Sequence, residues 1–372
     1  MTTQKVILII FAIYLTIFLA HALYLKKTIY GDGIFYYTWL RSAIIDHDVN
    51  FANEYKAFGV AQPLTVNGFP RNIYSIGPAM LWMPFFVFAH SVFRGQGYEF
   101  FYQTAIGVSG VFYAITGLIL VYRVLIKYFE ERVSALAILG LAFGTHLLFY
   151  GSVDTVNSHV YTFFAASVFL SLLFCEIKNW FALGFSLGLI GIIRMQDLIY
   201  AVLLIPFLER RQFPRTVIGF ITILLPQLII WQVFHGNFLE SPYFSEKKLF
   251  FMPFEPKVIE ILFAPTNGLY LWTPLLLVAT AGFLSMRFKQ KSLNFLVPLI
   301  VFIQVYVISI RNEWWQEASF SGRMFLSMLP LFALGLARAL ESLHVRILIL
   351  LYFLTPFFCL NLVLLAFYLS TH

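Results

Sequence analysis

The sequence predicts an all-α integral membrane protein, built as a multi-span helical bundle with a long first outer loop. Two properties predict this class. Of the 372 residues, 60% are hydrophobic and only 12% are charged, whereas an ordinary soluble domain carries about 25% charged residues. The mean hydropathy is +0.82. A soluble fold of this size does not need so much apolar surface for its core. We therefore expect residues 1–372 to form a single transmembrane domain.

Apolar stretches recur along the chain at close to the roughly 20 residues that a helix needs to cross a bilayer. Short polar segments separate them, and together they predict about eleven transmembrane helices. The predicted spans are 5–26, 101–122, 133–150, 159–176, 180–193, 197–208, 214–235, 269–286, 292–310, 323–340 and 345–368.

One further apolar stretch, 73–93, is ambiguous. Gly77-Pro78 and Pro84 interrupt it, and proline removes a helix hydrogen bond. We expect this stretch to be interfacial or re-entrant, packed against the bundle. A rival topology lets it cross and makes 180–208 one helix, which would bury Arg194 and Asp197 at mid-membrane at about 3 kcal/mol per charge.

If 73–93 does not cross, every short loop on the N-terminal side is basic, as the positive-inside rule requires. These loops contain Arg123, Lys127, Arg132, Lys178, Arg210, Arg211, Arg215, Arg287, Lys289, Lys291, Arg338 and Arg346. The two long loops, 27–100 and 236–268, then lie on the opposite, outer face with most of the acidic residues. Because the basic residues follow the topology, the net charge of +7 predicts no nucleic-acid partner.

The first outer loop opens with Gly31-Asp32-Gly33, followed by an aromatic stretch that includes Tyr36 and fits a short interfacial helix. One interpretation is a turn whose Asp32 caps the next helix. The other is that Asp32 is a catalytic carboxylate, held at the membrane boundary beneath a loop of about 70 residues, which is unusually long for a connection.

Several motifs resemble those of the GT-C glycosyltransferases, which include protein O-mannosyltransferases and aminoarabinose transferases. The resemblance rests on the first helix that ends in an acidic motif and on segments that follow it: 74–78 with 81–86, 144–150 with Asp154, 262–269 with 272–274, and 314–323. It covers nearly the whole chain through short motifs. Many members have an Asp-Glu pair in the first loop, whereas here Gly33 follows Asp32, which leaves the second acidic residue open.

The resemblance implies a glycosyltransferase that moves a sugar from a polyprenyl-phosphate-linked donor to a glycan, protein or lipid acceptor, with inversion. Such a reaction needs a base for the acceptor, and Asp32 is our candidate. Asp154 either caps the helix that follows it or supplies a second catalytic carboxylate, with His159 orienting the acceptor.

The leaving lipid phosphate needs cationic stabilisation. Arg323 and Arg194 are the first candidates; the alternatives are snorkelling for Arg323 and an ion pair with Asp197 for Arg194. We add six substrate-binding candidates from the same face, each with a packing, anchoring or solvated alternative: Tyr36, Arg71, Lys247, Trp315, Glu317 and His159.

Asp32, Asp154 and Glu313 have no metal-ligand spacing, so we predict no metal and no other cofactor. The resemblance implies a bacterial inner membrane, with the active site on the periplasmic or extracellular side. Two other classes stay open. A transporter or flippase of a lipid-linked substrate would have charges within several spans and two related halves. A non-catalytic membrane scaffold would have no need of the acidic, aromatic first loop.

Overall fold

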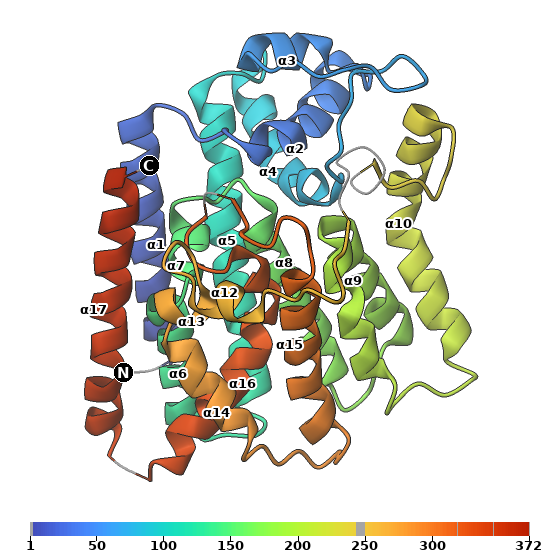
Figure 1. Ribbon diagram of the computed structural model, residues 1–372. Helices are drawn as coiled ribbons and strands as arrows, with labels where there is room; N and C mark the ends of the chain where they lie inside the picture. The colour runs from blue at the N-terminus through green and yellow to red at the C-terminus, as the bar shows by residue number, and fades with distance from the viewer. Residues whose placement is uncertain (1–2, 243–249, 318, 345, 372) are drawn as a thin grey trace.

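The computed structural model describes residues 3–242, 250–317, 319–344 and 346–371, and in this part of the chain the regular elements are all helices (Figure 1). Two isolated β-bridges accompany them, Leu64 with Pro70 and Phe251 with Arg311. The predicted all-α class is therefore correct.

Within the described residues, five helices are long and apolar enough to cross a membrane, which makes the chain an integral membrane protein. They are Gln4–Leu25 within α1 (Thr3–Leu25), α5 (Phe100–Leu125), α10 (Phe213–His235), Arg323–Ser342, and Leu348–Thr371 within α17 (Ile347–Thr371). Five shorter apolar helices join them: α4 (Gly77–Phe93), α8 (Ser158–Leu173), α9 (Trp180–Ile193), η2 (Met195–Leu204) and α15 (Leu293–Ser309). The expected count of about eleven spans is not confirmed.

Three predicted spans are interrupted. The stretch 133–150 divides at extended Thr145 into α6 (Glu131–Gly144) and α7 (Leu147–Ser152). Pro274 separates α13 (Leu269–Trp272) from α14 (Leu275–Phe283), since proline cannot continue a helix hydrogen-bond ladder. The stretch 323–340 begins as the 3₁₀ helix η3 (Arg323–Met328) before α16 (Leu329–Ser342). Such breaks are tolerated in a membrane bundle where they are packed within protein.

The helices pack in two connected groups (Figure 1). In one group, α10 packs on α9, α9 on α8, and α8 on α5, which also contacts α1; in the other, α16 lies between α14 and α6, and α6 contacts α17. Glycines allow close crossings, because a Cβ on Gly184 of α9 would lie 1.9 Å from the Thr216 carbonyl oxygen of α10. Small residues at such crossings are typical of membrane helices, which gain little from hydrophobic burial against one another.

The segment 27–100, which we predict to be the first outer loop, contains α2 (Asp32–Arg41), a π turn (Ser42–Asp46), α3 (Ala52–Phe58) and α4. The aromatic helix α2 is packed rather than lying free at an interface, because Tyr37, Trp39 and Leu40 are buried. A buried ion cluster closes the loop. The Arg41 guanidinium contacts Asp46 and Glu54, donates from Nε to the Gln96 carbonyl at 2.8 Å, and lies over the Tyr98 ring.

Helix α4 packs antiparallel to the first half of α5. Near the start of α4, the Leu81 carbonyl accepts from the Tyr113 hydroxyl at 2.9 Å, and at its end the Phe93 ring lies 3.8 Å from the ring of Phe101. Helix α4 belongs, with 17 residues, to the shorter apolar helices, and Pro84 lies inside it. That 73–93 is re-entrant stays a prediction.

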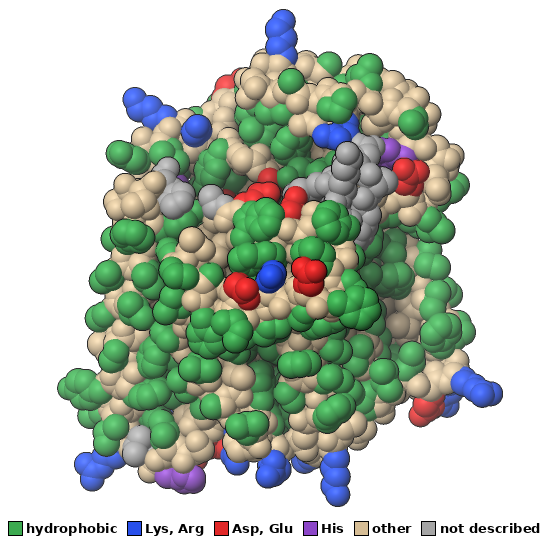
Figure 2. Space-filling view, in the orientation of Figure 1, with side chains coloured by type: hydrophobic (Ala, Val, Ile, Leu, Met, Phe, Trp, Pro, Cys, Tyr) green, Lys and Arg blue, Asp and Glu red, His purple; other side chains and the backbone are tan. Residues whose placement is uncertain are grey.

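The loops after α14 and α16 lie together at the lower end of the molecule (Figure 1). Figure 2 shows Lys and Arg side chains projecting from this end, below a broad band of hydrophobic side chains. Lys and Arg side chains also project from the upper end in this view. From the short basic loops we predict, by the positive-inside rule, that the lower end is cytoplasmic.

Candidate functional site

The start of α2 is held against the loop that contains Asp154. Gly31, before the helix, has a φ of +52°, which an L side chain rarely adopts. A Cβ on Gly33 would lie 2.8 Å from the carbonyl oxygen of Val156. Position 33 therefore favours glycine, because a side chain there would collide with this carbonyl oxygen. The carboxylate of Asp32 is brought to the 153–157 loop as a result.

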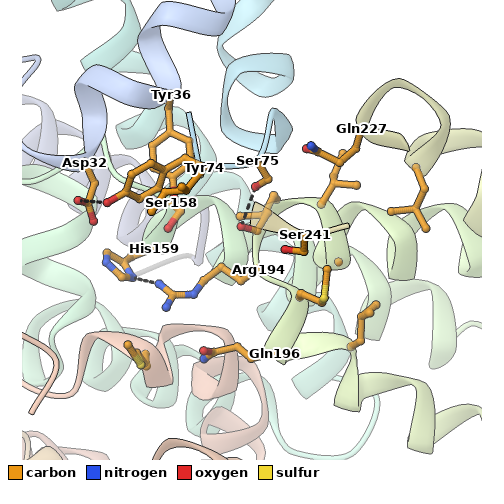
Figure 3. A pocket seen from close by; sticks show the side chains of 18 of the residues that line it. Asp32, Tyr36, Tyr74, Ser75, Ser158, His159, Arg194, Gln196, Gln227 and Ser241 are labelled. Carbon is orange, nitrogen blue, oxygen red and sulfur yellow. Dashed lines mark hydrogen bonds between the residues drawn. The ribbon is translucent and has the colours of Figure 1, made fainter. Parts of the chain in front are cut away.

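A large cavity lies below α2, with about 1340 Å³ of space between atoms, including the part open to solvent. Residues from α2, the 73–75 segment, α8, α9, η2, α10, α15 and η3 line it (Figure 3). The polar and charged residues of its wall are Asp32, Tyr36, Tyr74, Ser75, Ser158, His159, Arg194, Gln196, Gln227, Ser241, Arg311 and Arg323.

The orientation of Asp32 is set by Tyr74. The Tyr74 hydroxyl donates to Asp32 Oδ1 at 2.6 Å, as Figure 3 shows. The Tyr74 ring is in turn fixed between two aromatic rings of α2, stacked on Phe35 at 5.0 Å and edge-on to Tyr36 at 5.1 Å. A carboxylate held by one hydroxyl keeps further lone pairs for a second donor.

Arginines supply the positive charge of the cavity. Arg194, between α9 and η2, donates to His159 Nδ1 at 2.7 Å (Figure 3). Because a guanidinium only donates, this contact requires a neutral His159 that carries its proton on Nε2. Arg323 donates to Glu317 at 3.4 Å, and Arg311 donates to Gln196 Oε1 at 3.0 Å.

A buried carboxylate connects the segments that carry these arginines. Asp197, fully buried in η2, accepts from Gln304 of α15 at 3.0 Å and from Ser327 of η3 at 2.9 Å. Its own N–H donates to the carbonyl of Arg194 at 3.0 Å. No ion pair joins Asp197 to Arg194 in the part of the chain that the structure describes, so the simple pair that we considered from the sequence is replaced by this network.

The other wall of the cavity is apolar. It combines Ile192 and Ile193 of α9 with side chains of η2, α10 and α15: Met195, Leu198, Leu224, Leu228, Trp231 and Val307. The cavity therefore has a charged part beneath α2 and an apolar part between α10 and α15, a division that suits an amphipathic molecule.

Asp154 belongs to the same electrostatic site, although it is outside the cavity wall formed by the described residues. Burial raises its pKa to about 7; the charge of Arg323 lowers the pKa and the charge of Asp32 raises it. The nearby Tyr30 phenol has a pKa well above its ordinary value, first through burial and then through the charge of Asp154. Asp154 is thus a carboxyl group that can exchange a proton near neutral pH.

The predicted site residues divide into three groups. Asp32, Tyr36, His159, Arg194 and Arg323 line the cavity, and Glu317 reaches it through Arg323. Arg71 lies outside the cavity wall and donates to Gln62 at 3.2 Å. Trp315 also lies outside the described wall; it is 47% exposed and packs edge-on against Trp314. Lys247 lies outside the described residues.

Seven polar residues of the wall were not among the predicted site residues: Tyr74, Ser75, Ser158, Gln196, Gln227, Ser241 and Arg311. Arg311 had a usable signal, since it directly follows a predicted span and precedes the polar segment 312–317. Tyr74 had little signal, because nothing in the sequence brings it to Asp32, 42 positions earlier. Among the described residues, no group of three His, Cys, Asp or Glu side chains is placed to hold a metal ion.

Neither a protein-family model nor a curated protein matches the sequence. The fold, however, is similar to solved structures. ArnT from Cupriavidus metallidurans in the apo state matches with a TM-score of 0.55 at 13% identity, over 92% of this chain and 59% of ArnT. ArnT bound to undecaprenyl phosphate matches with a TM-score of 0.54 at 12% identity, over 92% of this chain and 60% of that one.

The Archaeoglobus fulgidus oligosaccharyltransferase, in complex with Zn and sulfate, matches with a TM-score of 0.51 at 13% identity, over 96% of this chain and 52% of the other. Both relatives are GT-C superfamily glycosyltransferases. The GT-C fold that the motifs implied is confirmed, and the chain spans about half to three-fifths of the length of these two proteins.

We predict that Asp154 makes stability depend on pH. Its carboxyl has a folded pKa of about 7 against an ordinary 3.8, so the folded state retains the proton more strongly. The stabilisation is complete below about pH 4 and is lost as the pH rises through 7. Thermal unfolding in detergent should show the Asp154→Asn variant losing less stability than wild type between pH 4 and 8. The difference should be on the order of 2 kcal/mol, after allowance for partial exposure. Parallel pH profiles for the two proteins would contradict the assignment.

A second prediction concerns Asp197. Replacement by leucine leaves the buried donors of Gln304 and Ser327 without their acceptor, which should cost about 3 kcal/mol. Asp197→Asn keeps an acceptor oxygen for both and should be much less destabilising. Melting temperatures of the two variants in detergent test this order; equal losses would show that charge, and not hydrogen bonding, holds the network.

Proposed function

We propose that this protein is a glycosyltransferase that moves a sugar from a polyprenyl-phosphate-linked donor to an acceptor at the non-cytoplasmic face of the membrane. One observation carries the proposal. A single cavity joins the oriented carboxylate of Asp32 to three arginines and to an apolar wall between membrane helices. A base, a phosphate site and a place for a lipid chain are the three components that this transfer requires.

Asp32 acts as the base. The acceptor oxygen or nitrogen attacks the anomeric carbon of the sugar, and its proton passes to the Asp32 carboxylate as the new bond forms. Tyr74 positions this carboxylate through its 2.6 Å hydrogen bond. The neighbouring Asp154, with its pKa raised to about 7 by burial, is suited to orienting the acceptor. A single displacement of this kind inverts the configuration at the anomeric carbon.

The bond that breaks joins the anomeric carbon to an oxygen of the carrier phosphate, which leaves with the electron pair. Arg194, Arg311 and Arg323 line the cavity and supply charge-assisted hydrogen bonds to the departing phosphate. The apolar residues of α10 and α15 in the cavity wall, with Trp231 among them, take the polyprenyl chain. We propose that no metal and no other cofactor takes part.

Structural neighbours support this reading. One ArnT structure contains undecaprenyl phosphate, a lipid phosphate of the kind proposed here. For this chain, we propose a bacterial inner membrane with the site on the periplasmic side, and an acceptor that is a glycan, a protein or a lipid headgroup. The basic loops at the opposite end of the bundle (Figure 2) agree with that orientation.

We predict that Asp32→Asn abolishes transfer. Asparagine retains an oxygen that can accept from Tyr74 but cannot take the acceptor proton, so the rate should fall by about 10² to 10⁴-fold. The assay uses purified protein in lipid with a panel of radiolabelled polyprenyl-phosphate sugars. Asp48→Asn is the matched control: Asp48 is an exposed carboxylate of the same loop that accepts from Ser42 at 2.6 Å, a bond that asparagine can keep.

Equal transfer by wild type and a folded Asp32→Asn protein would exclude Asp32 as the base. If no donor in the panel supports transfer, movement of the same labelled lipids between leaflets should be measured next, because leaflet exchange would identify a flippase instead.

We also predict that Arg194→Gln weakens binding of the lipid donor more than it lowers the rate of the transfer step. Loss of one charge-assisted hydrogen bond to phosphate should raise the KM for the lipid donor about 10 to 100-fold. Steady-state kinetics against donor concentration test this, with the exposed Arg346→Gln as control. An unchanged KM would remove Arg194 from the phosphate site.

A further inference from the structure

Residues 62–71 form a small hairpin in the predicted first outer loop, closed by a few backbone hydrogen bonds. The Thr65 N–H donates to the Phe69 carbonyl at 2.8 Å, and the Arg71 N–H donates to the Pro63 carbonyl at 2.8 Å. The turn is closed by Gly68 N–H to the Thr65 carbonyl at 3.0 Å, and the Thr65 hydroxyl accepts from Phe69 N–H at 3.2 Å. This pairing lowers the cost of moving the hairpin out of water.

The tip of this hairpin is apolar and exposed. Side chains alternate along a strand, so Thr65 is buried while Leu64 and Val66 are 67% and 83% exposed. No charged residue lies between Lys56 and Arg71. Leu64 and Val66 are thus two neighbouring exposed apolar side chains in an uncharged stretch of the loop.

The hairpin is attached to the outer end of α10. The Asn67 amide donates to the Val233 carbonyl at 2.7 Å, and the Phe69 ring stacks on Phe234 at 4.7 Å. Figure 1 shows the blue hairpin projecting beside this end of the helix. Just past the helix, Phe238 and Leu239 are also exposed, at 52% and 82%.

Helix α10 itself presents an exposed apolar face along its whole length, as a helix in contact with lipid does. The face consists of Phe213, Ile218, Ile221, Leu225, Ile229 and Val233. Its last member, Val233, is the residue whose carbonyl receives the Asn67 amide. The hairpin that exposes Leu64 and Val66 is therefore attached at the end of the exposed apolar face of α10.

We propose that the hairpin 62–71 inserts its tip, Leu64 and Val66, into the outer-leaflet interface of the bilayer. The occupant of this surface is lipid, and the anchor lies at the end of the helix whose Leu224, Leu228 and Trp231 line the cavity. It fixes the first outer loop, which carries Asp32, to the membrane surface. This inference does not depend on the reaction that the cavity performs.

Site-specific fluorescence in lipid nanodiscs tests the insertion. An environment-sensitive NBD label is attached to Val66→Cys in the full chain, with Cys175 and Cys359 replaced by serine. Lys56→Cys, an exposed position on α3 of the same loop, is the matched control. We expect blue-shifted emission at position 66 and quenching by headgroup-proximal doxyl lipids at least about twofold stronger than at position 56.

Equal quenching at the two positions, or none at position 66, would overturn the proposal. Blue-shifted emission at position 66 without quenching by doxyl lipid would also overturn it, since protein and not lipid would then cover the tip. Both labelled positions are exposed, and a melting curve for each variant shows that the fold is retained.

Discussion

The hydrogen bonds of one buried carboxylate set the geometry on which the cavity depends. Asp197 joins η2, α15 and η3 through Gln304 and Ser327. The segments joined in this way begin at Arg194 and Arg323. A charged group that is shielded from water is costly unless hydrogen bonds satisfy it. The two bonds to Oδ1 therefore tie together the segments that carry two of the cavity arginines.

The second constraint is the close approach of α2 to the loop before α8. Glycine at position 33 lets the Val156 carbonyl lie where a side chain would otherwise stand. Asp32, Asp154 and Arg323 are thereby brought within one electrostatic site. The charged part of the cavity is thus built from segments more than a hundred positions apart, and the apolar part from the neighbouring α9, α10 and α15. This division is the physical basis on which we propose a lipid-linked substrate.

Sequence reasoning reached much of this site, because its residues carry local signals. Asp32 stands between glycines at the end of an apolar run, and Arg194 and Arg323 stand at the edges of such runs. The same reasoning included Arg71 and Trp315, which have similar local surroundings but lie elsewhere. It passed over Tyr74, whose role is defined only by the position of its hydroxyl against Asp32.

By itself, the sequence determined the membrane class, the all-helical fold and the basic end of the bundle. These follow from composition and from charges next to apolar runs, which act locally through the cost of placing polar groups in lipid. Only the tertiary structure decided where helices break, as at Pro274 and Thr145, and which charges share a cavity. Those outcomes depend on distances between segments remote in the chain, and hydrophobic length and periodicity contain no information about such distances.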